Sequence, residues 1–372
     1  MDPYGPTARR FPLVARPRPA CRPLPERIAG LARLARTAAD GADPGKASAV
    51  QNLAALLASD VGLPELARQL CHQHATAYLN ACPLPSKTAI YALEPIVNLA
   101  RMQIRAGHPT DGHQRLLDLY KAVSTGTAGR SDDDITVPAQ LTTTSSDRRE
   151  VRAWLWKVVL ADGTRALTTA GRWADALAHL KTYRGIGARM LDGRQVAIVA
   201  ALTSGNATTA ERLLAETTPG EPWEAAVTAC LLVFCQRGVQ QPVSQQHLSE
   251  LAKTVLNEPA HPGRAVFHAR LTLSVLDAIG ANSPIACWLV NDLYQRVTAS
   301  SDGYAARECL AHDLFTTITT ESQDRDLTNI IDACALGVGA IPTDLNSALT
   351  AATTLSRSVI QTGLDAKGAT AC

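Results

Sequence analysis

Apolar residues recur along this chain at helical spacing, and glycine or proline interrupts the pattern at intervals. Between Leu160 and Ala170 the apolar positions fit one face of a helix. Gly171 then supplies a backbone that can end this helix, and Trp173 opens the next apolar run. The alternating runs of Val, Ile and Tyr that are typical of strands are hard to find. The pattern therefore predicts an all-α protein.

One local arrangement occurs four times: a glycine is followed five residues later by a small residue that opens an apolar run. The four pairs are Gly62 with Ala67, Gly107 with Gly112, Gly171 with Ala176, and Gly205 with Ala210. The glycine would end one helix, and the small residue would let the next helix cross it closely. The last two glycines are 34 residues apart, which is a known repeat length for stacked antiparallel helix pairs.

The segment 158–185, with small residues at Gly163, Thr164 and Ala176, resembles a repeat of the tetratricopeptide family. The segment that follows is similar through Ala201, Gly205, Ala210 and Leu214, but it lacks the large aromatic residue and the trailing proline of the family. The two upstream glycines are 45 residues apart, so repeats there would contain insertions. The resemblance implies a tetratricopeptide-like α-solenoid, a right-handed superhelix of antiparallel helix pairs that binds a peptide or protein and catalyses no reaction.

The distribution of proline, glycine, serine and threonine divides the chain into five parts. We expect a disordered or loosely docked Pro/Arg-rich arm at 1–24, an N-terminal helical lobe at 25–123, a Ser/Thr/Asp-rich loop at 124–147, a helical-repeat region at 148–363 and a frayed tail at 364–372. Five helices are expected before the loop and about ten after it.

Registering the repeats on the four glycines predicts which polar residues face the concave side of the superhelix. They are Asn52, Glu94, Arg101, Arg105, Arg165, Asp192 and Gln195. Because a guanidinium group binds a carboxylate through two parallel hydrogen bonds, several arginines on one face favour a carboxylate or an extended acidic peptide. The set predicts a binding site for a peptide or protein, with ordinary solvated helix residues as the alternative.

Composition and charge restrict the partners. The formal net charge is only +2, so bulk electrostatics indicate neither nucleic acid nor an anionic membrane as partner. The sequence has no apolar run of the ~18 residues that a membrane span needs, and no apolar segment follows the first arginines. Nine scattered cysteines without a CxxC pair indicate reduced thiols and a cytoplasmic location. Arginine far outnumbers lysine, a bias typical of a high-GC bacterium.

An all-helical enzyme is the main alternative, with the 124–147 loop closing over a cavity and Asp132, Asp133 and Asp134 as metal ligands or acid–base groups. These aspartates and the VNDLYQRVTAS segment match the magnesium-binding motifs of isoprenoid cyclases only in part, because Gln295 and Ala299 replace the expected serine and glutamate. A third interpretation is a sensor whose superhelix changes pitch when a peptide binds and whose output domain lies on another chain.

Cofactor and metal signatures are absent from the sequence. His72 and His74 are two residues apart, so on a helix their side chains would point about 200° from each other. Two such side chains cannot share a metal ion. There is no GxSxG motif, no GxxxxGK[ST] loop and no GxGxxG motif after a strand. We therefore expect no metal and no cofactor, while homo-oligomer formation stays open.

Overall fold

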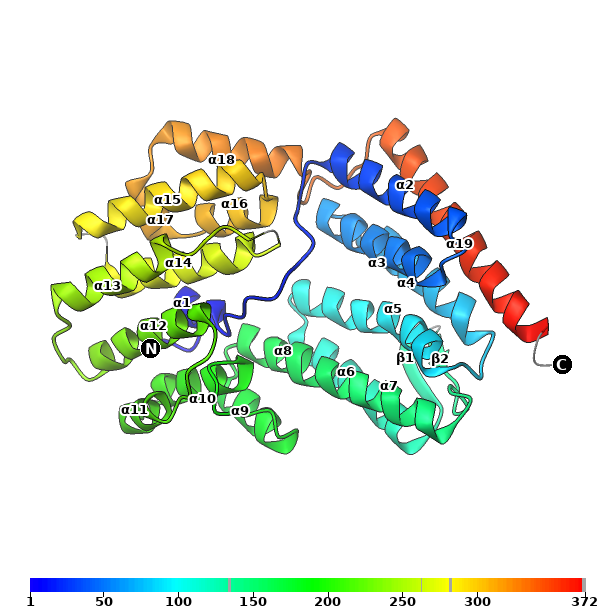
Figure 1. Ribbon diagram of the computed structural model, residues 1–372, viewed down its shortest axis with the longest axis horizontal. Coiled ribbons are helices and arrows are strands. Elements are labelled where there is room, and N and C mark those ends of the chain that lie inside the picture. Colours follow the sequence, from blue (N-terminus) through cyan, green and yellow to red (C-terminus); the bar gives the residue numbers. More distant parts are fainter. Residues whose placement is uncertain (133–134, 262, 281–282, 370–372) are drawn as a thin grey trace. The chain divides into compact units, whose positions relative to one another are not determined.

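The computed structural model describes residues 1–132, 135–261, 263–280 and 283–369, and these are predominantly α-helical (Figure 1). The all-α class expected from the sequence is confirmed. The chain divides into two compact units: unit 1 comprises Met1–Pro23 and Leu167–Cys334, and unit 2 comprises Leu24–Ala166 and Ala335–Cys372. The chain therefore passes from one unit to the other three times, and the second crossing falls inside helix α8 (Thr164–Thr169).

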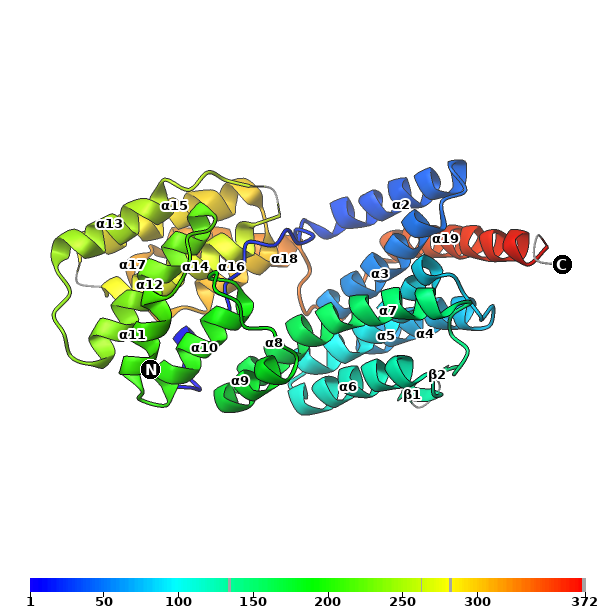
Figure 2. The same ribbon diagram turned by 60° about the horizontal axis from the view of Figure 1, so that its bottom comes forward.

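Unit 2 is built from helices that pack mainly on their neighbours in sequence, and the C-terminal helix returns to pack on the first two. Figure 2 shows α5, α6 and α7 side by side, with a small hairpin at one end. The elements are α2 (Leu24–Asp40), α3 (Pro44–Val61), α4 (Pro64–Leu79), α5 (Ser86–Arg105), α6 (Pro109–Thr125), β1 (Gly129–Asp132), β2 (Ile135–Val137), α7 (Ser145–Val158), the π-helical turn η1 (Val159–Gly163) and α19 (Thr343–Ala369).

Unit 1 follows the same rule, and a short helix near the N-terminus packs against α14. Its elements are α1 (Pro6–Arg10), α9 (Trp173–Thr182), α10 (Asp192–Thr203), α11 (Ala207–Ala215), α12 (Pro222–Gly238), α13 (Gln245–Leu256), α14 (Ala265–Ile279), α15 (Pro284–Ser300), α16 (Gly303–Leu310), α17 (Asp313–Ile318) and α18 (Glu321–Ala333).

The four glycine junctions have the local geometry that the sequence predicts. Each glycine lies between two helices with a positive φ, at 91°, 89°, 72° and 74° in chain order. Each small residue five positions later is buried. Gly112 shows why size matters there, because a Cβ at this position would lie 2.7 Å from the carbonyl oxygen of Ala100 on the preceding helix. Backbone freedom at the turn and close helix contact after it thus come from the same short pattern.

The N-terminal arm differs from its expectation. The sequence predicts a disordered or loosely docked arm at 1–24, whereas in the structure Leu24 opens α2 and the residues before it pack into unit 1 (Figure 1, blue). Phe11, Leu13 and Ala15 are buried, while the residues between them are only half-buried. This alternation is the pattern of an extended strand with one face against a core. The sequence could not indicate this packing, because the contacts of the arm lie far away in the sequence.

Two further expectations need correction. Residues 124–147 do not separate two lobes, since they belong wholly to unit 2 and contain the antiparallel β1–β2 hairpin, which packs on α4 and α6. The tail expected to fray from residue 364 continues as part of α19 as far as Ala369. The last three residues of that tail lie outside the described part of the chain, and so do Asp133 and Asp134 of the expected loop.

Candidate functional site

Several of the polar residues expected on one face meet in unit 2. Asn52 on α3 donates to the carboxylate of Glu94 on α5 at 2.8 Å and accepts from the amide of Asn98 at 3.0 Å. Asn98 in turn accepts from Arg101, whose guanidinium donates twice to one carboxylate oxygen of Asp162, at 2.8 and 3.0 Å. These residues form a continuous polar chain from α3 across α5 to η1.

The opposite charges within the polar chain, Arg101 and Asp162, pair with each other. The π-helical turn η1 presents Asp162 to Arg101, so this arginine already has a carboxylate partner. Burial raises the pKa of Glu94, while its hydrogen bond from Asn52 and the charge of Arg101 act in the opposite direction. Arg105, one turn farther along α5, is exposed and donates to the hydroxyl of Ser59 at 3.1 Å. The polar chain thus joins α3, α5 and η1 of unit 2 through contacts within the protein itself.

The remaining predicted residues are divided between the units. Arg165 is half-buried on α8 within unit 2. Asp192 and Gln195 lie at the start of α10 in unit 1, where they contact the N-terminal arm. The seven residues therefore do not form one surface within a single unit.

Gln195 holds the arm by its main chain. Its side-chain oxygen accepts from the backbone N–H of Leu13 at 2.6 Å, and its side-chain nitrogen donates to the carbonyl of Leu13 at 2.6 Å. The same nitrogen also donates to the carbonyl of Met190 at 3.0 Å, and Gln195 is fully buried. A primary amide that pairs with both polar groups of one residue replaces the neighbouring strand that an extended segment would need. Gln195 thus contacts the backbone at Leu13 in the way that a binding site contacts the backbone of an extended peptide.

Arg10 provides a second anchor. Its guanidinium forms an ion pair with Asp277 on α14, and its Nε donates to the hydroxyl of Ser274 at 3.1 Å. Thr7, one turn earlier on α1, donates to the same carboxylate at 2.5 Å. Burial lowers the pKa of Arg10 to about 10, so the side chain stays cationic at neutral pH. A charge removed from water in this way needs the partner that Asp277 supplies.

His312 completes the surroundings of Asp277. The backbone N–H of Phe315 donates to Nδ1 of His312 at 3.2 Å, so the ring proton resides on Nε2, which donates to Asp277 at 3.0 Å. Burial, and then the positive charge of Arg10, lower the pKa of His312 to about 4. The imidazole is therefore neutral near pH 7. The carboxylate of Asp277 accepts hydrogen bonds from Thr7 and Arg10 on α1 and from His312, which precedes α17.

The other contacts extend over most of unit 1. The ring of Phe11 meets Phe234 of α12 edge to face at a centroid distance of 6.5 Å, and Arg16 forms an ion pair with Asp192. Nearer the N-terminus, the indole of Trp173 donates to the carbonyl of Pro3 at 3.0 Å. We call the residues that hold the arm, Trp173, Asp192, Gln195, Phe234, Ser274 and Asp277, the arm site.

Part of the arm site was missed from the sequence. Ser274 and Asp277 are three residues apart on α14, so they share one face of a mostly apolar, buried helix, with Arg270 one turn before Ser274. Polar residues at helical spacing inside such a run are the signal that could have marked them. Their partner Arg10 could not be inferred, because it belongs to a segment without helical periodicity.

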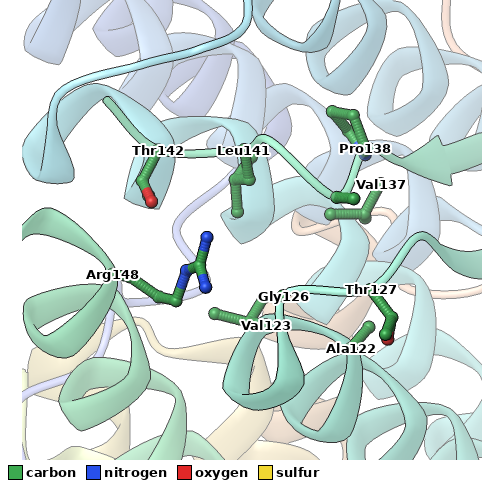
Figure 3. A pocket seen from close by; sticks show the side chains of 10 residues that line it. Ala122, Val123, Gly126, Thr127, Val137, Pro138, Leu141, Thr142 and Arg148 are labelled. Atoms are coloured by element: carbon green, nitrogen blue, oxygen red, sulfur yellow. The ribbon is translucent and has the colours of Figure 1, made fainter. Parts of the chain in front are cut away.

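The space beneath the 124–147 segment is small (Figure 3). It measures about 10 Å³, which corresponds to about one water molecule. Among the described residues that line it, Arg148 alone is charged. No three His, Cys, Asp or Glu side chains converge as metal ligands do, within the same described part of the chain. A substrate-sized, acid-lined cavity is not found there.

No family model, no curated protein and no solved structure matches this chain. Among the helices that the structure describes, none combines the length and the apolar character needed to cross a membrane.

Proposed function

We propose that this chain is a non-catalytic helical-repeat protein, a tetratricopeptide-like α-solenoid that binds an extended segment of a protein partner at the arm site of unit 1. The repeat architecture is supported by four glycine-ended helix junctions and by helices that pack mainly on their sequence neighbours. Stacked helix pairs of this kind present extended surfaces suited to peptides.

The pairing of Gln195 with Leu13 carries the proposal. A side chain that recognises main-chain groups holds any extended segment at that point, whatever its sequence. Selectivity then comes from the side-chain anchors on either side, which are the carboxylates of Asp277 and Asp192 and the ring of Phe234. Hydrogen bonds to the backbone, combined with side-chain contacts at fixed spacings, are typical of peptide-binding sites.

The charge of the arm site is opposite to the charge expected from the sequence. The arginines of unit 2 suggested a site for an acidic peptide, and Arg101 already pairs with Asp162 there. At the arm site, by contrast, the protein contributes carboxylates and the bound segment contributes arginines. We therefore propose a basic ligand rather than an acidic one.

The enzyme alternative has weaker support. The described residues around the 124–147 segment offer a space of about 10 Å³ without an acidic side chain in its lining. Substrate pockets are of the order of 300–1,000 Å³ and contain convergent polar groups. Nothing in the described part of the chain favours a particular reaction.

Binding of the arm peptide in trans tests the proposal. The probe is a fluorescein-labelled peptide with the sequence of residues 3–18, and the protein is the full chain with Arg10→Ala and Phe11→Ala, called the arm variant. We expect saturable binding by fluorescence anisotropy, and a loss of at least about tenfold when Gln195→Leu is added, because two main-chain hydrogen bonds disappear.

The matched control is Gln246→Leu in the arm variant. Gln246 lies on α13, is exposed and donates to Glu250, so the same chemical change there should leave peptide affinity unaltered. If the arm variant binds no peptide while its circular-dichroism spectrum stays helical, the proposed function is wrong.

A further inference from the structure

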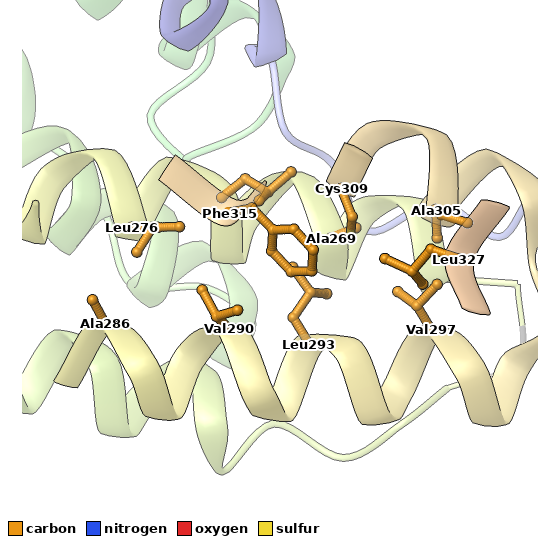
Figure 4. Packing of buried hydrophobic residues seen from close by; sticks show 12 residues of the cluster. Ala269, Leu276, Ala286, Val290, Leu293, Val297, Ala305, Cys309, Phe315 and Leu327 are labelled. Carbon is orange, nitrogen blue, oxygen red and sulfur yellow. The ribbon is translucent and has the colours of Figure 1, made fainter. Parts of the chain in front are cut away.

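The N-terminal arm contacts unit 1 as a bound ligand would, and one apolar cluster of that unit is packed without it. The apolar cluster in Figure 4 gathers buried residues from α14, α15, α16, α17 and α18 around Phe315. The cluster contains no residue of the arm, although Phe11 and Leu13 are themselves buried. This part of the helical array is packed by residues of the array alone.

Polar contacts hold the arm beside the buried side chains of Phe11 and Leu13. The Gln195 amide binds the main chain, Asp277 and Ser274 bind Arg10, and Asp192 binds Arg16. The free energy needed to remove a guanidinium from water offsets much of the electrostatic attraction in its ion pair, so a buried pair adds little net stability. The small net gain from this pair favours an arm that can exchange with another occupant.

The arm site also defines the chemistry of its occupant. An arginine enters between Asp277 and Ser274, and the aromatic residue directly after it meets Phe234. Leu13 lies over Gln195, and a second arginine follows the first by six residues to reach Asp192. A segment with basic and aromatic groups at these spacings would make the same contacts.

We propose that the arm is a built-in competitor at the arm site, displaced when a partner protein presents a basic segment with an arginine, an adjacent aromatic residue and a second arginine six residues after the first. This inference rests on the proposed function and adds the class of partner and its regulation. Because the arm is tethered, its effective concentration is of the order of millimolar, so a partner segment binds well only when it outcompetes the arm or the arm is weakened.

Titration of the labelled 3–18 peptide into the wild-type chain and the arm variant tests the competition. We expect the arm variant to bind the peptide at least tenfold more tightly than wild type. A second full-length variant, Arg9→Ala, is the matched control, because Arg9 is exposed beside the buried Arg10. It should bind the peptide as wild type does.

Peptide variants test the ligand chemistry with the same protein. An Arg10→Ala peptide should bind the arm variant at least tenfold more weakly than the parent peptide, and an Arg9→Ala peptide should bind as the parent does. Equal losses for the two peptides would overturn the proposed ligand class, because binding would then depend on net charge alone.

The outcomes separate this inference from the proposed function. Equal, Gln195-dependent binding by wild type and arm variant would leave peptide binding intact and overturn the competition. Absence of binding to both proteins would overturn both. A wild-type dimer in sedimentation that becomes a monomer in the arm variant would also overturn the proposal, in favour of exchange of arms between two copies of the chain.

Discussion

The carboxylate of Asp277 binds the guanidinium of Arg10, a residue 267 positions earlier in the chain. Asp277 lies in the middle of unit 1, while Arg10 belongs to the arm, so this ion pair reports whether the arm is docked. Both side chains are largely buried, with exposed fractions of 8% for Arg10 and 17% for Asp277. Removing one charge leaves the other without its partner in a place with little water.

Asp277→Asn should therefore release the arm. An unpaired buried charge costs about 3–5 kcal/mol, and the chain avoids this cost when Arg10 returns to solvent. Hydrogen exchange at the Leu13 amide, which donates to Gln195, should become faster by roughly 100-fold or more. The amide of Ile104, on α5 of unit 2, serves as the internal reference and should not change. Unchanged exchange at Leu13 would show that the ion pair does not hold the arm.

Two glycines allow backbone strain to be distinguished from a steric clash. Gly171 and Gly205 have φ of 72° and 74°, so alanine at either position is strained by about 1 kcal/mol. At Gly205 a Cβ meets no atom within 4 Å, but at Gly171 it would lie 2.5 Å from Cδ1 of Tyr4 in the arm. We expect Gly171→Ala to destabilise the protein more than Gly205→Ala does, and Gly171→Val to cost about 1–3 kcal/mol.

The measurement is the free energy of unfolding from urea denaturation of each variant. Adding Tyr4→Ala should bring Gly171→Ala to the level of Gly205→Ala, because the clash is then gone. If Gly171→Ala and Gly205→Ala lower the free energy of unfolding equally while Tyr4 is still present, then the Tyr4 side chain moves aside at no cost.

Helices and their boundaries could be predicted from the sequence because the signals are local. At the four junctions a glycine with a positive φ follows the last helical residue by one or two positions, and proline in the first turn starts a helix, as at Pro222 and Pro284. Ser283 caps α15 through its hydroxyl, as its position before Pro284 indicates. These interactions span a few residues, so they can be recognised without any knowledge of the fold.

The arm could not be predicted for the opposite reason. Its proline and arginine content is typical of disorder, and its order depends on Gln195 and Asp277, which are 182 and 267 residues away from their partners. The alternation of Phe11, Leu13 and Ala15 is too short to distinguish a strand from chance. The expected repeat register selected Asp192 and Gln195 as residues of a concave face, and it gave no indication that they contact the arm.

His74 should make unit 2 sensitive to acid. It is buried on α4, and neither ring nitrogen has a hydrogen-bond partner among the described residues. Burial lowers the pKa of His74 to about 3, whereas the unfolded chain has a value of about 6.5. The unfolded state therefore binds a proton first as the pH falls, and the contribution of His74 to stability is lost between about pH 6.5 and 3.

At pH 4.5 this loss amounts to about 2–3 kcal/mol, since each pKa unit corresponds to about 1.4 kcal/mol. Urea denaturation at pH 7.5 and 4.5 measures it, and His74→Leu should reduce the difference between the two free energies by that amount. His108→Leu, at an exposed position in the same unit, should leave the difference as it is. An equal acid sensitivity in all three proteins would exclude His74 as the cause.

His312 should make occupation of the arm site depend on pH. With the arm bound, the ring faces Arg10 from α1, Asp277 from α14 and Asp313 on its own helix, and its pKa is lowered to about 4, chiefly by burial and then by Arg10. When the arm site empties, water enters and the positive charge leaves, so the pKa rises toward about 6.5. Binding must then expel a proton below pH 6.5, and acid opposes it.

We expect the labelled 3–18 peptide, which carries its own Arg10, to bind the arm variant roughly 10- to 30-fold more weakly at pH 5 than at pH 7.5. A shift of the His312 pKa from about 6.5 to about 4 on binding produces a change of this size. His312→Asn removes the titrating ring, while asparagine can still accept from the N–H of Phe315 as a helix cap. Affinity of this variant should stay nearly constant over the same range. A slope that survives the substitution would assign the pH dependence to another group.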